Sequence, residues 1–127
     1  MISMRSTFLT LLTTTLLISY AQADDLLYVF APDCGACNRF DKEVGTIYAK
    51  TQEARALPLV KVSFEQWRAN QHPFTNCAIG PVLGTPTFIQ VSDCKELDRI
   101  TGYSNDELFW IALKRMENRS TAASSAP

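Results

Sequence analysis

The pattern of apolar and polar residues along the chain predicts four strands and three helices, in the order β-α-β-α-β-β-α. Short apolar runs that are rich in β-branched and aromatic residues predict the strands. Apolar residues that recur every three or four positions predict the helices. The expected strands are 26–30, 59–64, 87–91 and 97–101, and the expected helices are 34–54, 65–70 and 105–118.

Two of the predicted helices carry local signals of their own. Gly45 is a weak point within the long helix 34–54, because glycine is a poor helix former. Ser104 and Glu107 have the spacing of a capping box, which marks a helix start. The last helix then carries its apolar stripe at Phe109, Ala112, Leu113 and Met116.

The first 23 residues have the layout of a secretory signal peptide. Arg5 precedes a mostly apolar, Thr-rich run over 8–20, and Ala21 and Ala23 form a small-x-small cleavage pattern. A membrane anchor would need about 20 apolar residues, which is longer than this run. A core helix is the other alternative, and the Thr content argues against it. We therefore expect a signal peptide at 1–23, one domain at 24–118 and a small, polar, disordered tail at 119–127.

Charge excludes some classes of partner. The 127 residues contain 12 Lys and Arg against 13 Asp and Glu, a formal net charge of −1, and no basic run interrupts the sequence. Nucleic acids and anionic membrane surfaces attract basic patches, so we expect neither as a partner.

All four cysteines, Cys34, Cys37, Cys77 and Cys94, follow the signal peptide. In an exported protein they mature where disulfides persist. Four cysteines allow three pairings, and spacing alone does not choose among them. For Cys77 and Cys94 we favour a structural disulfide, with two unpaired thiols or a second redox pair as the alternatives.

The CxxC motif of Cys34 and Cys37 allows a metal site, a structural staple or disulfide exchange. A zinc site would need a second close pair of ligands, and His72, the one histidine, lies outside any ligand spacing. Asn38 stands where covalent haem attachment needs histidine. A disulfide across so short a loop stabilises a fold little. A strand before the motif and a helix after it favour exchange, because a helix start stabilises the thiolate of Cys34 and places Cys37 one turn away.

With this motif between a strand and a helix, the sequence resembles the thioredoxin superfamily. The resemblance rests on 29–31 before the Cys-Gly-Ala-Cys motif, on Gly-Thr-Pro-Thr-Phe at 84–88, and on Gly-Tyr-Ser at 102–104. It implies an α/β thioredoxin-like fold with a mixed four-stranded sheet and no cofactor or metal. It also implies that Cys34 attacks, that Cys37 resolves, and that Thr85 and a cis Pro86 bind the substrate strand.

A narrower resemblance is to the small periplasmic thioredoxin-like proteins, called SoxS-like, of bacterial sulfur oxidation. Thr-Pro-Thr-Phe at 85–88 and the combination of Gly102, Tyr103, Phe109 and Trp110 carry it. It implies a periplasmic monomer that reduces an oxidised cysteine or disulfide on a partner protein, with electrons from a membrane thiol-transfer protein. The alternatives are a disulfide-introducing oxidase and a non-catalytic binding module with the same fold.

The sequence also departs from the thioredoxin pattern around the motif. Tyr28 occupies the position of a buried acid, so Lys61 lacks the partner that the family gives it. Asp33 replaces the usual tryptophan before Cys34, and an anion there opposes thiolate formation, which Arg39 would partly offset. The central dipeptide is Gly-Ala instead of Gly-Pro, so the family's redox potential does not carry over.

Overall fold

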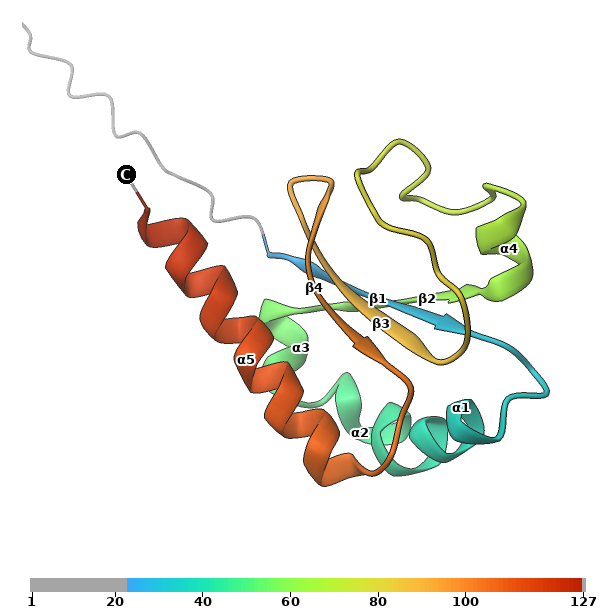
Figure 1. The fold of residues 1–127 in the computed structure, drawn as a ribbon. Helices are drawn as coiled ribbons and strands as arrows, with labels where there is room; N and C mark the ends of the chain where they lie inside the picture. The colour runs from blue at the N-terminus through green and yellow to red at the C-terminus, as the bar shows by residue number, and fades with distance from the viewer. Residues whose placement is uncertain (1–22, 127) are drawn as a thin grey trace, which may run out of the picture.

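Residues 23–126 are described by the computed structural model, and their centre is a four-stranded sheet with helices on both faces (Figure 1). The strand order is β2-β1-β3-β4. β1 pairs with β2 in parallel, and the β1–β3 and β3–β4 pairs are antiparallel, so the predicted mixed sheet is confirmed. The strands are β1 (Asp25–Phe30), β2 (Leu59–Ser63), β3 (Thr87–Ser92) and β4 (Lys95–Thr101).

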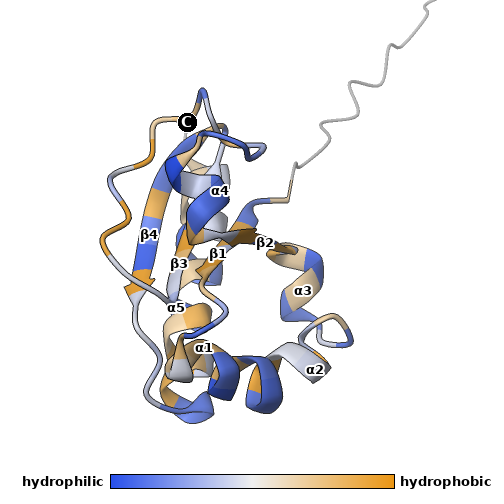
Figure 2. Cartoon of the chain, turned by 90° about the vertical axis from the view of Figure 1, so that its right-hand side faces the viewer, coloured by the Kyte–Doolittle hydropathy of each residue, from blue (hydrophilic) through white to orange (hydrophobic). Residues whose placement is uncertain are grey.

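The central strand β1 is buried on both faces. Leu26 and Tyr28 belong to the apolar cluster that packs against α1 (Gly35–Phe40) and α5 (Asp106–Ser125). Leu27 and Val29 alternate with them and belong to a second cluster on the opposite face. A strand that is covered on both faces has a continuous apolar sequence. Figure 2 shows the contrast with β4, along which hydrophobic and hydrophilic residues alternate.

The helix predicted over 34–54 is wrong as a single element. α1 continues through a π-helical turn, η1 (Asp41–Gly45), into α2 (Thr46–Tyr48), and α3 (Glu53–Ala56) follows after a break. The hydroxyl of Thr51 donates to the Tyr48 carbonyl oxygen at 2.6 Å and accepts from the Ala54 N–H at 3.3 Å. Thr51 therefore ends one helical segment and begins the next, because its side chain competes for backbone hydrogen bonds.

The short helix α4 (Phe64–Arg68) begins with a capping box that the sequence analysis missed. The Ser63 hydroxyl accepts from the Gln66 N–H, and the Gln66 side chain accepts from the Ser63 N–H. The capping box predicted for the last helix is wrong, because Asn105 is the N-cap residue and its side chain accepts from the Leu108 N–H at 2.9 Å. Asparagine is as good an N-cap as serine, so Asn105 can cap α5 in place of its neighbour Ser104.

The prediction of a disordered tail from residue 119 is also wrong, since α5 continues to Ser125. The buried amide of Gln90 on β3 donates to Ser120 Oγ at 2.7 Å and to the Met116 carbonyl oxygen at 2.9 Å. The Ser120 hydroxyl also donates to Asp24. These tertiary contacts order a segment whose composition by itself predicts no packing.

The signal-peptide prediction lies outside the described residues except for Ala23, which is exposed ahead of β1. No helix within 23–126 has the length and apolar character to cross a membrane.

Candidate functional site

The sheet brings the CxxC motif and the Thr85–Pro86 dipeptide to the same edge. Val29, near the end of β1, pairs with Thr87 at the start of β3. The chain leaves β1 at this edge toward α1, and it enters β3 here from the segment after α4, as Figure 1 shows. Cys34 precedes α1, and Pro86 precedes β3. Residues that are fifty positions apart in the sequence therefore lie at one end of the sheet.

Cys34 is the N-cap residue of α1 and forms a disulfide with Cys37. The Cα atoms of the two residues are 5.2 Å apart. The backbone N–H of Cys37 donates to Cys34 Sγ at 3.1 Å. Cys34 is half-buried, whereas Cys37 is only 1% exposed. The geometry thus distinguishes an accessible sulfur from an enclosed one.

Local backbone structure favours negative charge on Cys34 in the dithiol form. Helical residues run without interruption from α1 through η1 to Tyr48, so peptide dipoles along this segment point their positive end at Cys34. The N–H of Cys37 would give a thiolate a charge-assisted hydrogen bond. Thiolate formation is the requirement for attack on a disulfide.

Behind the buried Cys37 lies a polar cluster from three elements. The Tyr28 hydroxyl donates to the Cys37 carbonyl oxygen at 3.4 Å. Lys61 Nζ lies 2.9 Å from Asp41 Oδ2 and 4.4 Å from the centroid of the Phe30 ring. Burial, and then the Asp41 carboxylate, raise the pKa of Tyr28 well above its usual value, so its hydroxyl stays neutral. The acid that pairs with Lys61 therefore comes from the helix after the motif and not from β1.

The side chain of Arg39 bonds to the turn before α5. Its guanidinium donates to the Tyr103 carbonyl oxygen at 3.1 Å, and the Tyr103 hydroxyl donates to Glu43. These contacts join α1 and η1 to the turn before α5. Asp33 is exposed beside the disulfide. No local sequence signal predicts the pairings of Tyr103, because about sixty residues separate it from its partners.

The peptide bond between Thr85 and Pro86 is cis. Pro86 is buried, and its carbonyl oxygen accepts from the Gly102 N–H at 2.8 Å. Gly102 has φ +83°, a conformation that side chains rarely adopt, so glycine suits this contact. Within residues 23–126 no backbone hydrogen bond engages the N–H or C=O of Thr85, which is half-buried. Thr85 therefore has both groups available for an added strand.

An apolar groove lies beside the CxxC motif. Phe30 and Pro32 line it from the end of β1, and Phe64 and Ala69 line it from α4. Pro32 is two residues from Cys34, so one wall of the groove is next to the motif in the chain.

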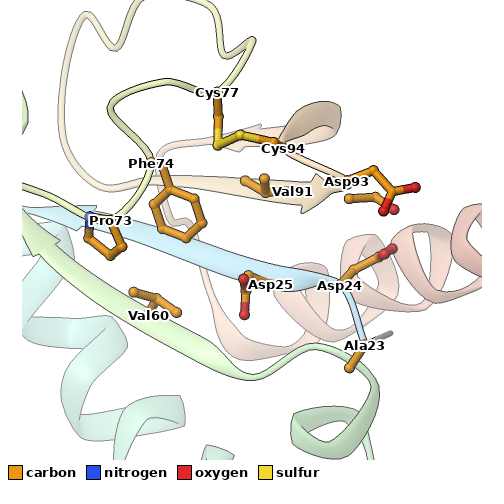
Figure 3. A pocket seen from close by; sticks show the side chains of 11 residues that line it. Ala23, Asp24, Asp25, Val60, Pro73, Phe74, Cys77, Val91, Asp93 and Cys94 are labelled. Atoms are coloured by element: carbon orange, nitrogen blue, oxygen red, sulfur yellow. A yellow bond between two sulfur atoms is a disulfide. The ribbon is translucent and has the colours of Figure 1, made fainter. Parts of the chain in front are cut away.

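The second cysteine pair lies at the opposite end of the sheet. Cys77 and Cys94 form a disulfide with a Cα separation of 4.5 Å, and Figure 3 shows it joining the loop after α4 to the β3–β4 turn. Cys94 is exposed, and Asp93 is in the same turn. Figure 3 also shows Asp25 in the pocket next to this bridge. The bridge spans 17 positions at the end of the sheet away from Pro86, which suits a structural role better than an exchanging one.

No group of side chains in 23–126 has the arrangement of a metal site. His72 stacks on Trp67 with ring centroids 4.2 Å apart, and its Nδ1 accepts from the Phe74 N–H at 3.2 Å. Burial lowers the pKa of His72. His72 is thus committed to packing the loop after α4.

The sequence matches the family described as a thioredoxin-like domain over residues 20–117. The chain belongs to this thioredoxin-like family. The predicted membership of the thioredoxin superfamily and the predicted α/β thioredoxin-like fold are therefore confirmed. None of the curated proteins matches this thioredoxin-like chain.

Solved structures give the same fold for this thioredoxin-like protein. The reduced periplasmic thioredoxin SoxS from Paracoccus pantotrophus is 31% identical, with a TM-score of 0.68, and the match covers 76% of this chain and 98% of that one. Trxlp from Edwardsiella tarda is 25% identical, with a TM-score of 0.55 over 72% of this chain and 82% of that one. Thioredoxin from Aeropyrum pernix is 17% identical, with a TM-score of 0.50, and the match covers 76% of this chain and 77% of that one. At this identity the match shows the fold alone.

Proposed function

We propose that this protein is a periplasmic thiol–disulfide oxidoreductase that reduces a disulfide or oxidised cysteine on a partner protein. The observation that carries the proposal is the unequal pair Cys34 and Cys37. Cys34 is accessible at a helix start and accepts the Cys37 N–H, whereas Cys37 is enclosed. An attacking thiol needs access and thiolate character, and a resolving thiol needs only proximity to it.

The exchange takes place in two steps. The Cys34 thiolate attacks one sulfur of the partner's disulfide, so a mixed disulfide forms and the partner's other sulfur leaves as a thiolate. Cys37, as a thiolate, then attacks Cys34 Sγ, which closes the Cys34–Cys37 disulfide and releases the second partner thiolate. Two electrons pass to the partner. A dithiol protein must then reduce the Cys34–Cys37 disulfide, and we infer that a membrane thiol-transfer protein does so.

Thr85 and Pro86 guide the partner in this proposal. The free N–H and C=O groups of Thr85 pair with an extended segment next to the partner's cysteine, as in other cases of strand addition. The likeness to a periplasmic thioredoxin supports export. The signal-peptide pattern at 1–23 supports the same location. The proposed role beside sulfur oxidation rests on the narrower sequence resemblance.

Reduction of insulin disulfides tests the activity. We expect turnover by the wild type with dithiothreitol as the electron source, and loss of turnover in Cys34→Ser. Equal turnover by both proteins, or none by reduced wild type, contradicts the proposal. The direction is tested by the equilibrium potential of the pair against glutathione, since a value near about −270 mV favours a reductase and one near about −120 mV an oxidase.

A further inference from the structure

The segment between the second disulfide and Pro86 has no regular secondary structure, yet it is bound along its length. We call residues 80–85 the clamped loop. Two residues before the loop, the Ala78 N–H donates to the Cys94 carbonyl oxygen at 2.8 Å, and the Glu96 N–H donates to the Ala78 carbonyl oxygen at 3.0 Å. At its end, the Thr87 hydroxyl donates to the Gly84 carbonyl oxygen at 2.7 Å.

Two side chains of β4 hold the loop between these ends. Arg99 donates through Nη1 to the Pro81 carbonyl oxygen at 2.7 Å and through Nη2 to the Gly80 carbonyl oxygen at 3.2 Å. Its Nε and Nη2 also donate to the two oxygens of Glu96 at 2.7 and 2.8 Å. Glu96 Oε2 accepts from the Gly80 N–H at 2.9 Å. Bidentate, charge-assisted hydrogen bonds of this kind fix geometry more firmly than neutral ones.

Gly80 is what allows this close approach. A Cβ at this position would lie 3.3 Å from Arg99 Nη2 and 3.5 Å from Glu96 Oε2. The first distance is tighter than ordinary van der Waals contact, so the guanidinium would have to shift by a few tenths of an ångström. The absent side chain is therefore part of the arrangement.

The loop presents one large apolar side chain to solvent. Val82 turns inward and is 7% exposed, whereas Leu83 is 90% exposed. Leu83 lies two residues before Thr85, whose N–H and C=O make no backbone hydrogen bond within residues 23–126. An extended partner segment that pairs with Thr85 would therefore place one of its own side chains, close to the partner's cysteine, against Leu83.

We propose that Arg99 and Glu96 are positioning residues for partner recognition, which hold the clamped loop so that Leu83 and Thr85 meet an extended polypeptide beside its oxidised cysteine. The inference rests on the proposed function. Within residues 23–126, no hydrogen bond or ion pair joins Arg99 or Glu96 to Cys34 or Cys37. Exchange with a small disulfide, which needs only the cysteines, is therefore independent of the loop.

The test compares Arg99→Lys with Arg115→Lys. Lysine keeps the charge but lacks the planar fork. Arg115 is a matched control, because it makes two hydrogen bonds to Asp98 at 2.7 and 3.2 Å and does not touch the loop. For Arg99→Lys we expect the KM for insulin to rise about tenfold, with kcat and the rate with glutathione disulfide within about twofold of wild type. The redox potential should stay unchanged. Arg115→Lys should match wild type in all four measurements.

The outcomes separate the two proposals. An inactive wild type rejects the proposed function. An active wild type with equal KM values in the two lysine variants rejects the positioning role. Parallel loss of the insulin and glutathione rates in Arg99→Lys also rejects it, because the residue would then support the whole fold.

Leu83→Ser keeps the inference testable if Arg99→Lys does not fold. Leu83 makes little contact with the rest of the protein, so this variant should fold as the wild type does. We expect a higher KM for insulin and an unchanged rate with glutathione disulfide. An unchanged KM for insulin overturns the inference.

Discussion

The hydroxyl of Tyr28 donates a hydrogen bond of 3.4 Å to the carbonyl oxygen of Cys37, which connects the central strand to the enclosed half of the redox motif. The raised pKa of Tyr28, due first to burial and then to Asp41, keeps this hydroxyl protonated across the physiological range. The sheet core and the enclosed Cys37 are thus joined by one neutral donor.

Tyr28→Phe should lower the free energy of unfolding by roughly 1 kcal/mol, because it removes one buried hydrogen bond and preserves the ring. Tyr48→Phe is the matched control. The Tyr48 hydroxyl donates to the Leu57 carbonyl oxygen at 2.6 Å, and this hydrogen bond does not involve the CxxC motif. Urea unfolding measures both losses. We expect only Tyr28→Phe to change the potential of the Cys34–Cys37 pair, and an equal change in Tyr48→Phe would contradict the link.

Cys37→Ser should accumulate a mixed disulfide with insulin or glutathione, whereas Cys34→Ser should not. The reason is access, because Cys37 is 1% exposed and Cys34 is half-buried. Mass spectrometry under non-reducing conditions measures the trapped species. Equal trapping by both variants would show that the two sulfurs are equally accessible and would refute the assignment of roles.

Replacing both Cys77 and Cys94 by serine should cost about 3 kcal/mol of stability, because their bridge closes a long loop. The bridge spans 17 positions, compared with 3 for Cys34 and Cys37. The double serine variant at Cys34 and Cys37 should therefore lose less. Urea denaturation of the three proteins gives the comparison, and the reverse order would count against a structural role for the second bridge.

Stability should fall in acid partly through Glu96. The hydrogen bond from Arg99 is the largest influence on this carboxyl and lowers its pKa below the usual 4.5. A lowered folded-state pKa stabilises the fold fully above 4.5, and the gain is lost as the pH falls through the folded value. Glu96→Gln should therefore flatten the decline in the urea midpoint between about pH 5 and 3. An unchanged slope would exclude this contribution.

Ser120→Ala should destabilise the protein by roughly 1 to 2 kcal/mol, because the buried Gln90 amide and Asp24 lose a shared partner. Ser125→Ala is the control, since its hydroxyl bonds only within α5 among the described residues. Thermal unfolding measures both. Equal midpoints for the two variants would show that the tail does not contribute to the core.

Local sequence specifies some features of this fold, and long-range contacts specify the others. The strands, the strand–CxxC–helix order and the last helix were predicted, because apolar periodicity and β-branched content act over a few residues. The break at Thr51 and the N-cap at Asn105 were missed, since several residue types compete for the same backbone groups at helix ends. The extension of α5 to Ser125 was missed because contacts with Gln90 and Asp24 order it.

By itself, then, the sequence determined the position of Cys34 at a strand–helix boundary and the family to which the chain belongs. Only the tertiary structure decided that Asp41 pairs with Lys61, that Arg99 holds Gly80, and which cysteines meet at the far end of the sheet. The physical reason is that each of these pairs is brought together by sheet register and helix packing. Strand pairing and burial are cooperative properties of the whole domain, so no short window of the sequence contains them.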